Sequence, residues 1–183
     1  MLLRVRGPVC GHATNTHSAK MTAGVSPTFG FLIRHPAHFI ALGFGAGLAP
    51  VAPGTFGTLV AIPIAAVLRQ QFSEGVFVTA IVVFALLGIW AAQVTGRHLG
   101  VPDHGAIVWD EVVAFLLVLY FVGGEGVRIA VAFVVFRFFD IVKPPPIRQL
   151  DAALKNGLGV MVDDLAAAGY TLLVLALAKR FIG

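Results

Sequence analysis

The acidic residues are the side chains of this sequence best suited to chemistry, because six of its nine Asp and Glu residues stand beside long apolar segments. They form two adjacent pairs and two single positions: Asp110-Glu111, Asp163-Asp164, Asp103 and Asp140. Carboxylates that converge repel one another unless a cation neutralises them, and all-oxygen ligands favour Mg²⁺, Ca²⁺ or Mn²⁺ over zinc. The pairs therefore predict a divalent-metal site at the ends of apolar helices. The alternative is that each acid caps a helix N-terminus and opposes the helix dipole.

A Gly- and Pro-rich segment, LAPVAPGTFGT (48–58), is the second candidate feature. A Gly-rich turn that opens a helix presents free backbone N–H groups, which suit a phosphate, and hydroxyl groups can add hydrogen bonds. The residues in question are Gly54, Thr55, Gly57 and Thr58. The same composition is typical of an ordinary loop before a helix, so this segment alone leaves both interpretations open.

The third feature, FRFFDIVKPPPI (136–147), combines basic and acidic residues. Asp140 and Lys143 are three residues apart and share a helix face, which predicts a simple ion pair. Alternatively, Arg137 and Lys143 hold a phosphate beside a carboxylate–metal cluster, a usual combination for phosphoryl chemistry. The residues alone do not decide between these interpretations.

The histidines and the cysteine give weaker signals. His98 and His104 lie near the acidic residues and could transfer protons, although a solvated loop position is the simpler interpretation. His35 and His38 flank a proline, which disfavours a metal-binding pair. The single cysteine, Cys10, excludes an internal disulfide and a Cys-based zinc site.

The composition indicates the class of protein to which these residues belong. Hydrophobic residues make up 58% of the 183-residue chain and charged residues 12%, and the mean hydropathy is +0.91. A soluble domain is about 45–50% apolar and about 25% charged. The composition therefore excludes a disordered or collagen-like chain and favours a single-domain integral membrane protein. The net charge is +4, but the sequence has no long basic run with interleaved aromatic residues, so nucleic acid is not an expected partner.

Apolar runs and helix breakers predict the elements that position the site. We expect apolar or helical segments at 38–48, 56–70, 75–96, 106–122, 127–142 and 158–180, with a loop at 49–55 and a stop at the proline run 144–146. The 75–96 segment is long enough to cross about 30 Å of hydrocarbon, and several others are short. The predicted fold class is all-α: a compact bundle of about five to six helices in a polytopic membrane protein with several short spans. Residues 1–28 are predicted to form a mobile N-terminal tail, with Met21 as a possible start, and 29–183 a single helical domain.

The Lys and Arg residues predict an orientation in the membrane. If 95–111 and 137–160 lie on one side with the N-terminal region, that side holds nine Lys and Arg residues. The other side then holds four: Arg69, Arg128, Lys179 and Arg180. The first side, which also carries the acidic residues, is therefore expected to face the cytoplasm, although Lys179 and Arg180 work against this assignment.

Four stretches together resemble the phosphatidylglycerophosphatase A family: APVAPGTFGT (49–58), DHGAIVWDEVV (103–113), FRFFDIVKPPPIRQLD (136–151) and GLGVMVDDLAAAG (157–169). The resemblance covers about residues 38–180, in the family's order and spacing. It implies an all-helical enzyme of a bacterial membrane. Together with the charge pattern above, it predicts a multi-pass protein of the bacterial inner membrane whose active site faces the cytoplasm. It also implies a Mg²⁺-dependent reaction that removes the terminal phosphate of phosphatidylglycerol phosphate to give phosphatidylglycerol.

The resemblance carries roles over to matching positions. It implies metal ligation by Asp110, Glu111, Asp163 and Asp164, and catalytic roles for Asp103, Asp140 and Lys143. Phosphate binding is expected at Gly54, Thr55, Gly57, Thr58, Arg137 and Lys143. The expected partner is a lipid substrate in the membrane, and the sequence identifies no protein partner.

Two other classes of protein compete with a Mg²⁺-dependent lipid phosphatase. A small cation transporter would also place carboxylates inside a membrane, and a structural membrane protein could use them as helix caps. A transporter needs no phosphate-binding loop and no basic residue beside the acids, and its acids would lie near the midplane of the membrane. The 49–58 and 136–147 motifs therefore favour the phosphatase.

Overall fold

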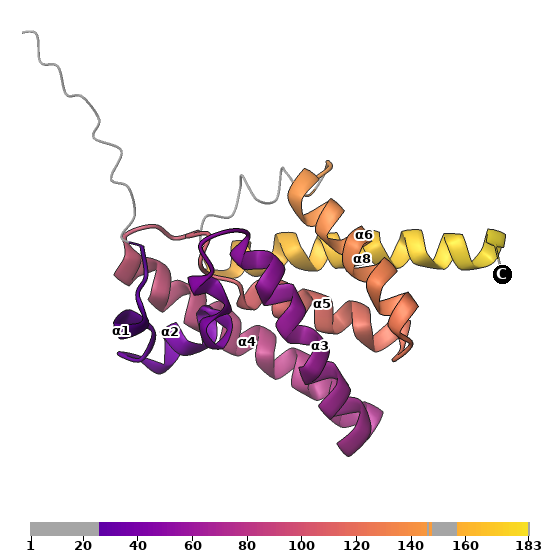
Figure 1. Cartoon of the computed structure of the whole chain (residues 1–183), viewed down its shortest axis with the longest axis horizontal. Helices are drawn as coiled ribbons and strands as arrows, with labels where there is room; N and C mark the ends of the chain where they lie inside the picture. The colour runs from indigo at the N-terminus through magenta and orange to yellow at the C-terminus, as the bar shows by residue number, and fades with distance from the viewer. Residues whose placement is uncertain (1–25, 146, 148–156, 183) are drawn as a thin grey trace, which may run out of the picture.

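The apolar runs fold into helices in the computed structural model of the chain (Figure 1). The structure describes residues 26–145, 147 and 157–182, so most of the predicted tail at 1–28 lies outside the described residues. The elements in the described part are α1 (Phe29–Leu32), α2 (Pro36–Ala41), the 3₁₀ helix η1 (Gly43–Leu48), α3 (Pro53–Gln71), α4 (Glu74–Leu99), α5 (Trp109–Val122), α6 (Gly126–Val142) and α8 (Gly157–Ile182). The predicted all-α fold class is confirmed.

The ends of the long helices follow local signals in the sequence. Pro53 begins α3, where its missing N–H removes no helix hydrogen bond. α4 ends at Gly100, whose φ of 74° lets its N–H bond to the carbonyl oxygens of Gly96 and Arg97. α6 ends directly before Lys143 and the proline run. The predicted bounds of these three helices therefore differ from the observed bounds by no more than three residues at either end.

The predicted apolar piece at 38–48 is divided into two elements. α2 ends at Ala41, and η1 begins with three residues of positive φ, Gly43 (55°), Phe44 (58°) and Gly45 (108°), which interrupt a regular helix. The predicted segment at 106–122 becomes helical only at Trp109. Just before it, the Val108 N–H donates to the Ala41 carbonyl oxygen at 2.9 Å, so the end of α2 holds the start of α5.

α5 is the central helix of the bundle. It contacts α3, α4, α6 and α8, and nine of its fourteen residues are buried. Phe115 of α5 and Phe136 of α6 are both fully buried, with ring centroids 5.4 Å apart. Burial of each such side chain contributes about 1.5–3 kcal/mol. This packing fixes the position of the first turn of α5, which carries Asp110 and Glu111.

Two helices, α4 and α8, are long and apolar enough to cross a membrane. Each has 26 residues, which corresponds to about 39 Å at about 1.5 Å per residue. Both expose aliphatic side chains, such as Leu86 (63% exposed) and Leu173 (56% exposed). These surfaces suit contact with lipid. α3, α5 and α6 are shorter, with 19, 14 and 17 residues, and the total number of spans stays a prediction.

Candidate active site

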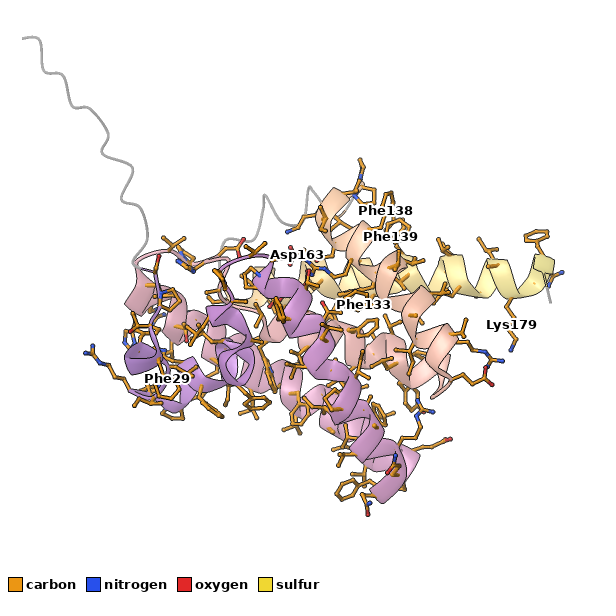
Figure 2. All side chains as sticks on the ribbon, viewed as in Figure 1. Phe29, Phe133, Phe138, Phe139, Asp163 and Lys179 are labelled. Carbon is orange, nitrogen blue, oxygen red and sulfur yellow. The ribbon has the colours of Figure 1, made fainter. Side chains whose placement is uncertain are left out.

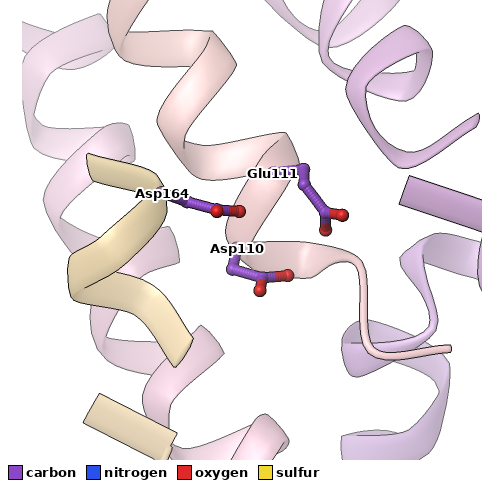
Figure 3. Close-up of side chains that lie close together, drawn as sticks. All are labelled: Asp110, Glu111 and Asp164. Carbon is purple, nitrogen blue, oxygen red and sulfur yellow. The ribbon is translucent and has the colours of Figure 1, made fainter. Parts of the chain in front are cut away.

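Two helices bring acidic side chains from distant parts of the sequence together. Asp110 and Glu111 lie in the first turn of α5, and α8 packs against α5, so that Asp164 reaches across to them (Figure 3). One carboxylate oxygen from each of these three residues lies within 4.8 Å of the others. We call Asp110, Glu111 and Asp164 the acid cluster. The structure thus brings together three of the four residues predicted to share a metal.

The acid cluster is shielded from water. Asp110 is 8% exposed, Asp164 is 3% exposed, and the Glu111 side chain is 13% exposed. One oxygen of each residue is buried and has no hydrogen-bond partner among the described residues: Asp110 Oδ1, Glu111 Oε2 and Asp164 Oδ2. A buried acceptor without a partner costs about 1–3 kcal/mol, and a charged one costs more. The cluster therefore has buried acceptors that the described side chains leave unsatisfied, as expected of a binding site.

Burial and like charge both disfavour ionised carboxylates at the start of α5, which lies outside the two membrane-length helices. Burial raises the pKa of Asp110 well above its ordinary value, and the charges of Glu111 and of the α8 acids add to the rise. Burial also raises the pKa of Glu111 to about 7. The hydrogen bond with Asp110 and the charge of Arg137 oppose that rise, whereas the charge of Asp140 adds to it. Protons or a cation must neutralise part of this cluster.

The acid cluster fits a divalent cation that prefers oxygen ligands. Its ligand atoms are carboxylate oxygens, and three of them lack a partner, which matches the preference of Mg²⁺, Ca²⁺ and Mn²⁺. Helix capping does not explain the whole cluster. Asp164 lies seven residues after Gly157, the first residue of α8, and is therefore too deep in that helix to cap it.

Arg137 of α6 connects the acid cluster to its surroundings. Its Nη1 atom lies 2.5 Å from Asp140 Oδ2 and 3.7 Å from Glu111 Oε1. The same atom donates a long hydrogen bond of 3.5 Å to the Oγ1 of Thr58, whose hydroxyl donates to the Gly54 carbonyl at 2.9 Å. Arg137 therefore joins α3, α5 and α6 at one point. The sequence motif predicted Arg137 as a phosphate ligand but gave no signal for its contact with Glu111.

The start of α3 approaches the acid cluster closely because it carries glycine. A Cβ atom on Gly54 would lie 2.0 Å from Glu111 Oε1 and 3.1 Å from Arg137 Nη1. A Cβ atom on Gly57 would likewise lie 2.7 Å from the Cβ of the residue that precedes α5. Thr55 is half-buried in the same turn. The structure therefore places the predicted phosphate loop beside the acids, with Gly54 at the point of contact.

Lys143 and Asp163 pair between α6 and α8. Lys143 follows the last residue of α6 with a left-handed backbone (φ 44°), and its Nζ atom donates to Asp163 Oδ2. Asp163 therefore lies outside the three-residue acid cluster, although it was predicted as a ligand. Asp140 pairs with Arg137, so the ion pair expected between Asp140 and Lys143 is replaced by two pairs with other partners. Both cations remain beside the acids.

Asp103 is the predicted catalytic residue that the structure places farthest toward solvent. It is exposed, in the loop between α4 and α5. Asp103 lies outside the acid cluster, which among the described residues comprises only the three acids named above. His104 is half-buried in the same loop, where its Nδ1 accepts from the Ala106 N–H at 3.2 Å.

A histidine network is a feature that the sequence did not predict. His38 is 2% exposed, its Nδ1 lies 3.0 Å from Thr95 Oγ1, and its Nε2 lies 3.0 Å from His98 Nδ1. Burial and, to a smaller extent, the nearby His98 and His35 together lower the pKa of His38 to about 4. His98, predicted near the acids, instead contacts α2. The only sequence signal for this network is the presence of histidines in two segments that turn out to be neighbours.

Buried carboxylates beside an arginine and a lysine, in a bundle with two membrane-length helices, define a helical membrane protein that can hold a divalent cation and an anionic group together. Comparison with known proteins makes this class specific. The family model described as Phosphatidylglycerophosphatase A matches residues 39–179. The chain belongs to this family and is a phosphatase, and the matched range includes every candidate site residue named above.

Individual relatives agree with the family assignment. The chain is 42% identical over 142 residues to the phosphatidylglycerophosphatase A of Haemophilus influenzae, which covers 77% of this chain and 87% of that protein. It is 37% identical over 134 residues to the enzyme of the same name from Escherichia coli, covering 73% and 77% of the two chains. A Bacteroides thetaiotaomicron protein provisionally named as a phosphatidylinositol-3-phosphatase is 38% identical over 151 residues, covering 79% and 94%. No solved structure matches the chain.

Proposed function

We propose that the chain hydrolyses the terminal phosphate monoester of phosphatidylglycerol phosphate to phosphatidylglycerol and inorganic phosphate, with Mg²⁺ held at the acid cluster. The family and the names of two relatives support this substrate. The observation that carries the proposal is the acid cluster, whose three partnerless oxygens lie beside the ion-paired cations of α6.

Asp110, Glu111 and Asp164 are the residues that would hold Mg²⁺. When bound, Mg²⁺ stabilises negative charge that develops on the phosphoryl oxygens. Asp163 stays a predicted ligand, but its contact with Lys143 supports a different role, which is to hold that lysine at the edge of the site. The Asp164 side chain faces α5 and the Asp163 side chain contacts the end of α6, so adjacent acids can serve both purposes.

Arg137 and Lys143 are the residues that would bind the substrate phosphate. Each is fixed by a carboxylate, Arg137 by Asp140 and Lys143 by Asp163, and a fixed cation needs little rearrangement when the phosphate arrives. Gly54 keeps the start of α3 close enough for the loop to complete the phosphate site.

Hydrolysis also needs a proton to reach the leaving group. A water oxygen forms a bond to phosphorus, the bond between phosphorus and the glycerol oxygen breaks, and that oxygen takes up a proton. Asp140 pairs with Arg137 beside the acid cluster, and it is our first candidate for handling protons. Asp103 is the second, because its loop leads directly into α5.

The proposed location is the bacterial inner membrane, with the acid cluster on the cytoplasmic side. The two membrane-length helices support a membrane protein, and the excess of Lys and Arg residues on the side of the acids supports the orientation. Cation transport, the alternative function, has no specific observation in its favour. The acids lie near one end of α8 and directly beside two ion-paired cations.

The test is phosphate release from phosphatidylglycerol phosphate by purified protein in detergent micelles, with added Mg²⁺ or with excess EDTA. We expect release to require Mg²⁺ and to be lost in Asp164→Asn. Glu125→Gln is the matched control, because Glu125 is an exposed acid at the other end of the bundle. Full turnover in EDTA would refute the metal site. Mg²⁺-dependent release from phosphatidylinositol 3-phosphate or phosphatidic acid, but not from phosphatidylglycerol phosphate, would refute the substrate.

A further inference from the structure

An apolar groove lies at the end of the bundle opposite the acid cluster. It has a volume of about 530 Å³, within the range of about 300–1,000 Å³ that is typical of sites for small molecules. Its walls come from the end of α5, the start of α6 and the end of α8, and they include Phe121, Val131 and Leu175. The phosphatase reaction described above makes no use of this groove.

The distance along α8 separates the groove from the active site. Asp163 and Lys179 lie on the same helix, sixteen residues apart, and Figure 2 shows them at well-separated points along it. At about 1.5 Å per residue this separation is about 24 Å. If α8 crosses the membrane, Lys179 therefore lies at the membrane–water interface on the side opposite the acid cluster.

The groove combines exposed apolar walls with positive charge at its rim. Phe121 is 65% exposed and Val127 is 79% exposed. Arg128 and Lys179 both line the groove, from α6 and α8 respectively. Arg128 also forms a 3.0 Å ion pair with Glu125, whose side chain is 69% exposed. Two cations thus face one acid, so the rim keeps a positive charge.

We propose that this groove binds one anionic phospholipid of the leaflet opposite the active site, with an acyl chain between α6 and α8 and its phosphate at Lys179 and Arg128. An acyl chain suits the apolar walls, and the positive rim complements an anionic headgroup. Long basic side chains at a helix end can reach the headgroup region while their apolar stems remain beside the chain. The site also gives a role to the C-terminal basic residue that works against the membrane orientation predicted from charge.

The expected selectivity follows from the charge of the rim. One Lys or Arg near a membrane surface attracts anionic lipid by about 1 kcal/mol, or roughly fivefold in binding. Lys179→Gln should therefore reduce the preference for an anionic lipid about fivefold. Arg180→Gln is the matched control, because Arg180 is the adjacent, exposed cation and does not line the groove. Ala176→Phe should fill the groove and reduce binding of every phospholipid, since Ala176 is an exposed lining residue.

The experiment is native mass spectrometry of the purified full chain, titrated with phosphatidylglycerol or with phosphatidylcholine of the same acyl chains. Phosphatidylglycerol bound at the active site is common to all variants, so each variant is compared with the wild type for the same lipid. We expect the wild type and Arg180→Gln to retain more phosphatidylglycerol than phosphatidylcholine, Lys179→Gln to show about fivefold less of that preference, and Ala176→Phe to retain less of either lipid than the wild type. Glycerol 3-phosphate, which has the phosphate but no acyl chain, should not compete.

Three results would overturn the proposal. The first is equal retention of the two lipids by the wild type. The second is the same preference in Lys179→Gln and Arg180→Gln. The third is a dimer that forms without lipid and is broken by Ala176→Phe, because a second copy of the chain would then occupy the groove.

Discussion

Substitution of Gly54 by alanine is the most direct test of how the start of α3 shapes the active site. The added Cβ atom would lie 2.0 Å from Glu111 Oε1, whereas ordinary van der Waals contact begins at 3.4 Å. The Glu111 carboxylate must therefore move by about 1.4 Å, the difference between the two distances, or the helix start must retreat by as much. Arg137 Nη1, 3.1 Å from the same point, limits movement in its direction.

The displacement is large on the scale that metal binding and catalysis tolerate. Metal–ligand distances are held to about ±0.2 Å, and a misplacement of about 1 Å at a reacting centre costs about 10²-fold in rate. We therefore expect Gly54→Ala to lower kcat/KM about 10²-fold and to raise the Mg²⁺ concentration needed for half-maximal activity. Stability should change little, because alanine gains up to about 1 kcal/mol of helix propensity over glycine, which offsets the strain.

The assay compares phosphate release by Gly54→Ala with release by Gly75→Ala across a Mg²⁺ titration. Gly75 is the second residue of α4, as Gly54 is of α3, and a Cβ atom there meets nothing within 4 Å. The double variant Gly54→Ala/Glu111→Asp should recover part of the activity, because the shorter side chain withdraws the carboxylate by about 1.5 Å. Equal activity of the two glycine variants at every Mg²⁺ concentration would refute the reasoning.

Three further predictions concern charged groups. Asp164→Asn should remove a ligand and lower activity at least about 10²-fold, with the Mg²⁺ titration and circular dichroism showing a folded protein that no longer responds to the ion. Lys143→Ala should lower kcat about 10²–10³-fold in a protein that stays folded, whereas loss of an exposed cation in Arg180→Ala should stay within twofold, so equal effects of the two would contradict a phosphate-binding role. His38 should make the protein acid-sensitive: its folded pKa of about 4 lies below the ordinary value of 6.5, so the unfolded state gains a proton first as pH falls. The contribution of neutral His38 to the free energy of unfolding is therefore fully present above about pH 6.5, and about 1–3 kcal/mol of it is lost as the pH falls toward 4. Thermal unfolding of His38→Gln should show a smaller loss of stability over that window.

The bounds of the helices could be predicted from the sequence because local residues set them. Pro53 starts α3, Gly100 ends α4 and the prolines after Lys143 end α6, and each acts through its own backbone geometry. The division of 38–48 into α2 and η1 could not be predicted. It depends on a tertiary contact, because a Cβ atom on Gly43 would lie 2.8 Å from the side chain of Val108, which is far away in the sequence.

The meeting of the two acidic pairs was predictable, but the role of each residue was not. Adjacent residues on a helix point about 100° apart, so only one of Asp163 and Asp164 can face α5. The rotation of α8 about its own axis decides which one, and that rotation is set by packing along the whole helix. The partner of Lys143 could not be predicted from the sequence for a similar reason. Its left-handed backbone directs the side chain away from the α6 face that carries Asp140 and toward α8.

The charge balance of the site couples metal binding to substrate binding. Five acids and two cations gather there: Asp110, Glu111, Asp140, Asp163, Asp164, Arg137 and Lys143. With all of them ionised the sum is two minus five, or −3, which repels a phosphate monoester that carries about −1.5 to −2. Protons could relieve this repulsion, but a protonated carboxyl group does not ligate a metal. A divalent cation relieves it and leaves the carboxylates occupied, so that Arg137 and Lys143 can attract the phosphate. The lipid should therefore bind productively only where the cation is already in place, and the apparent affinity for substrate should rise with the concentration of Mg²⁺.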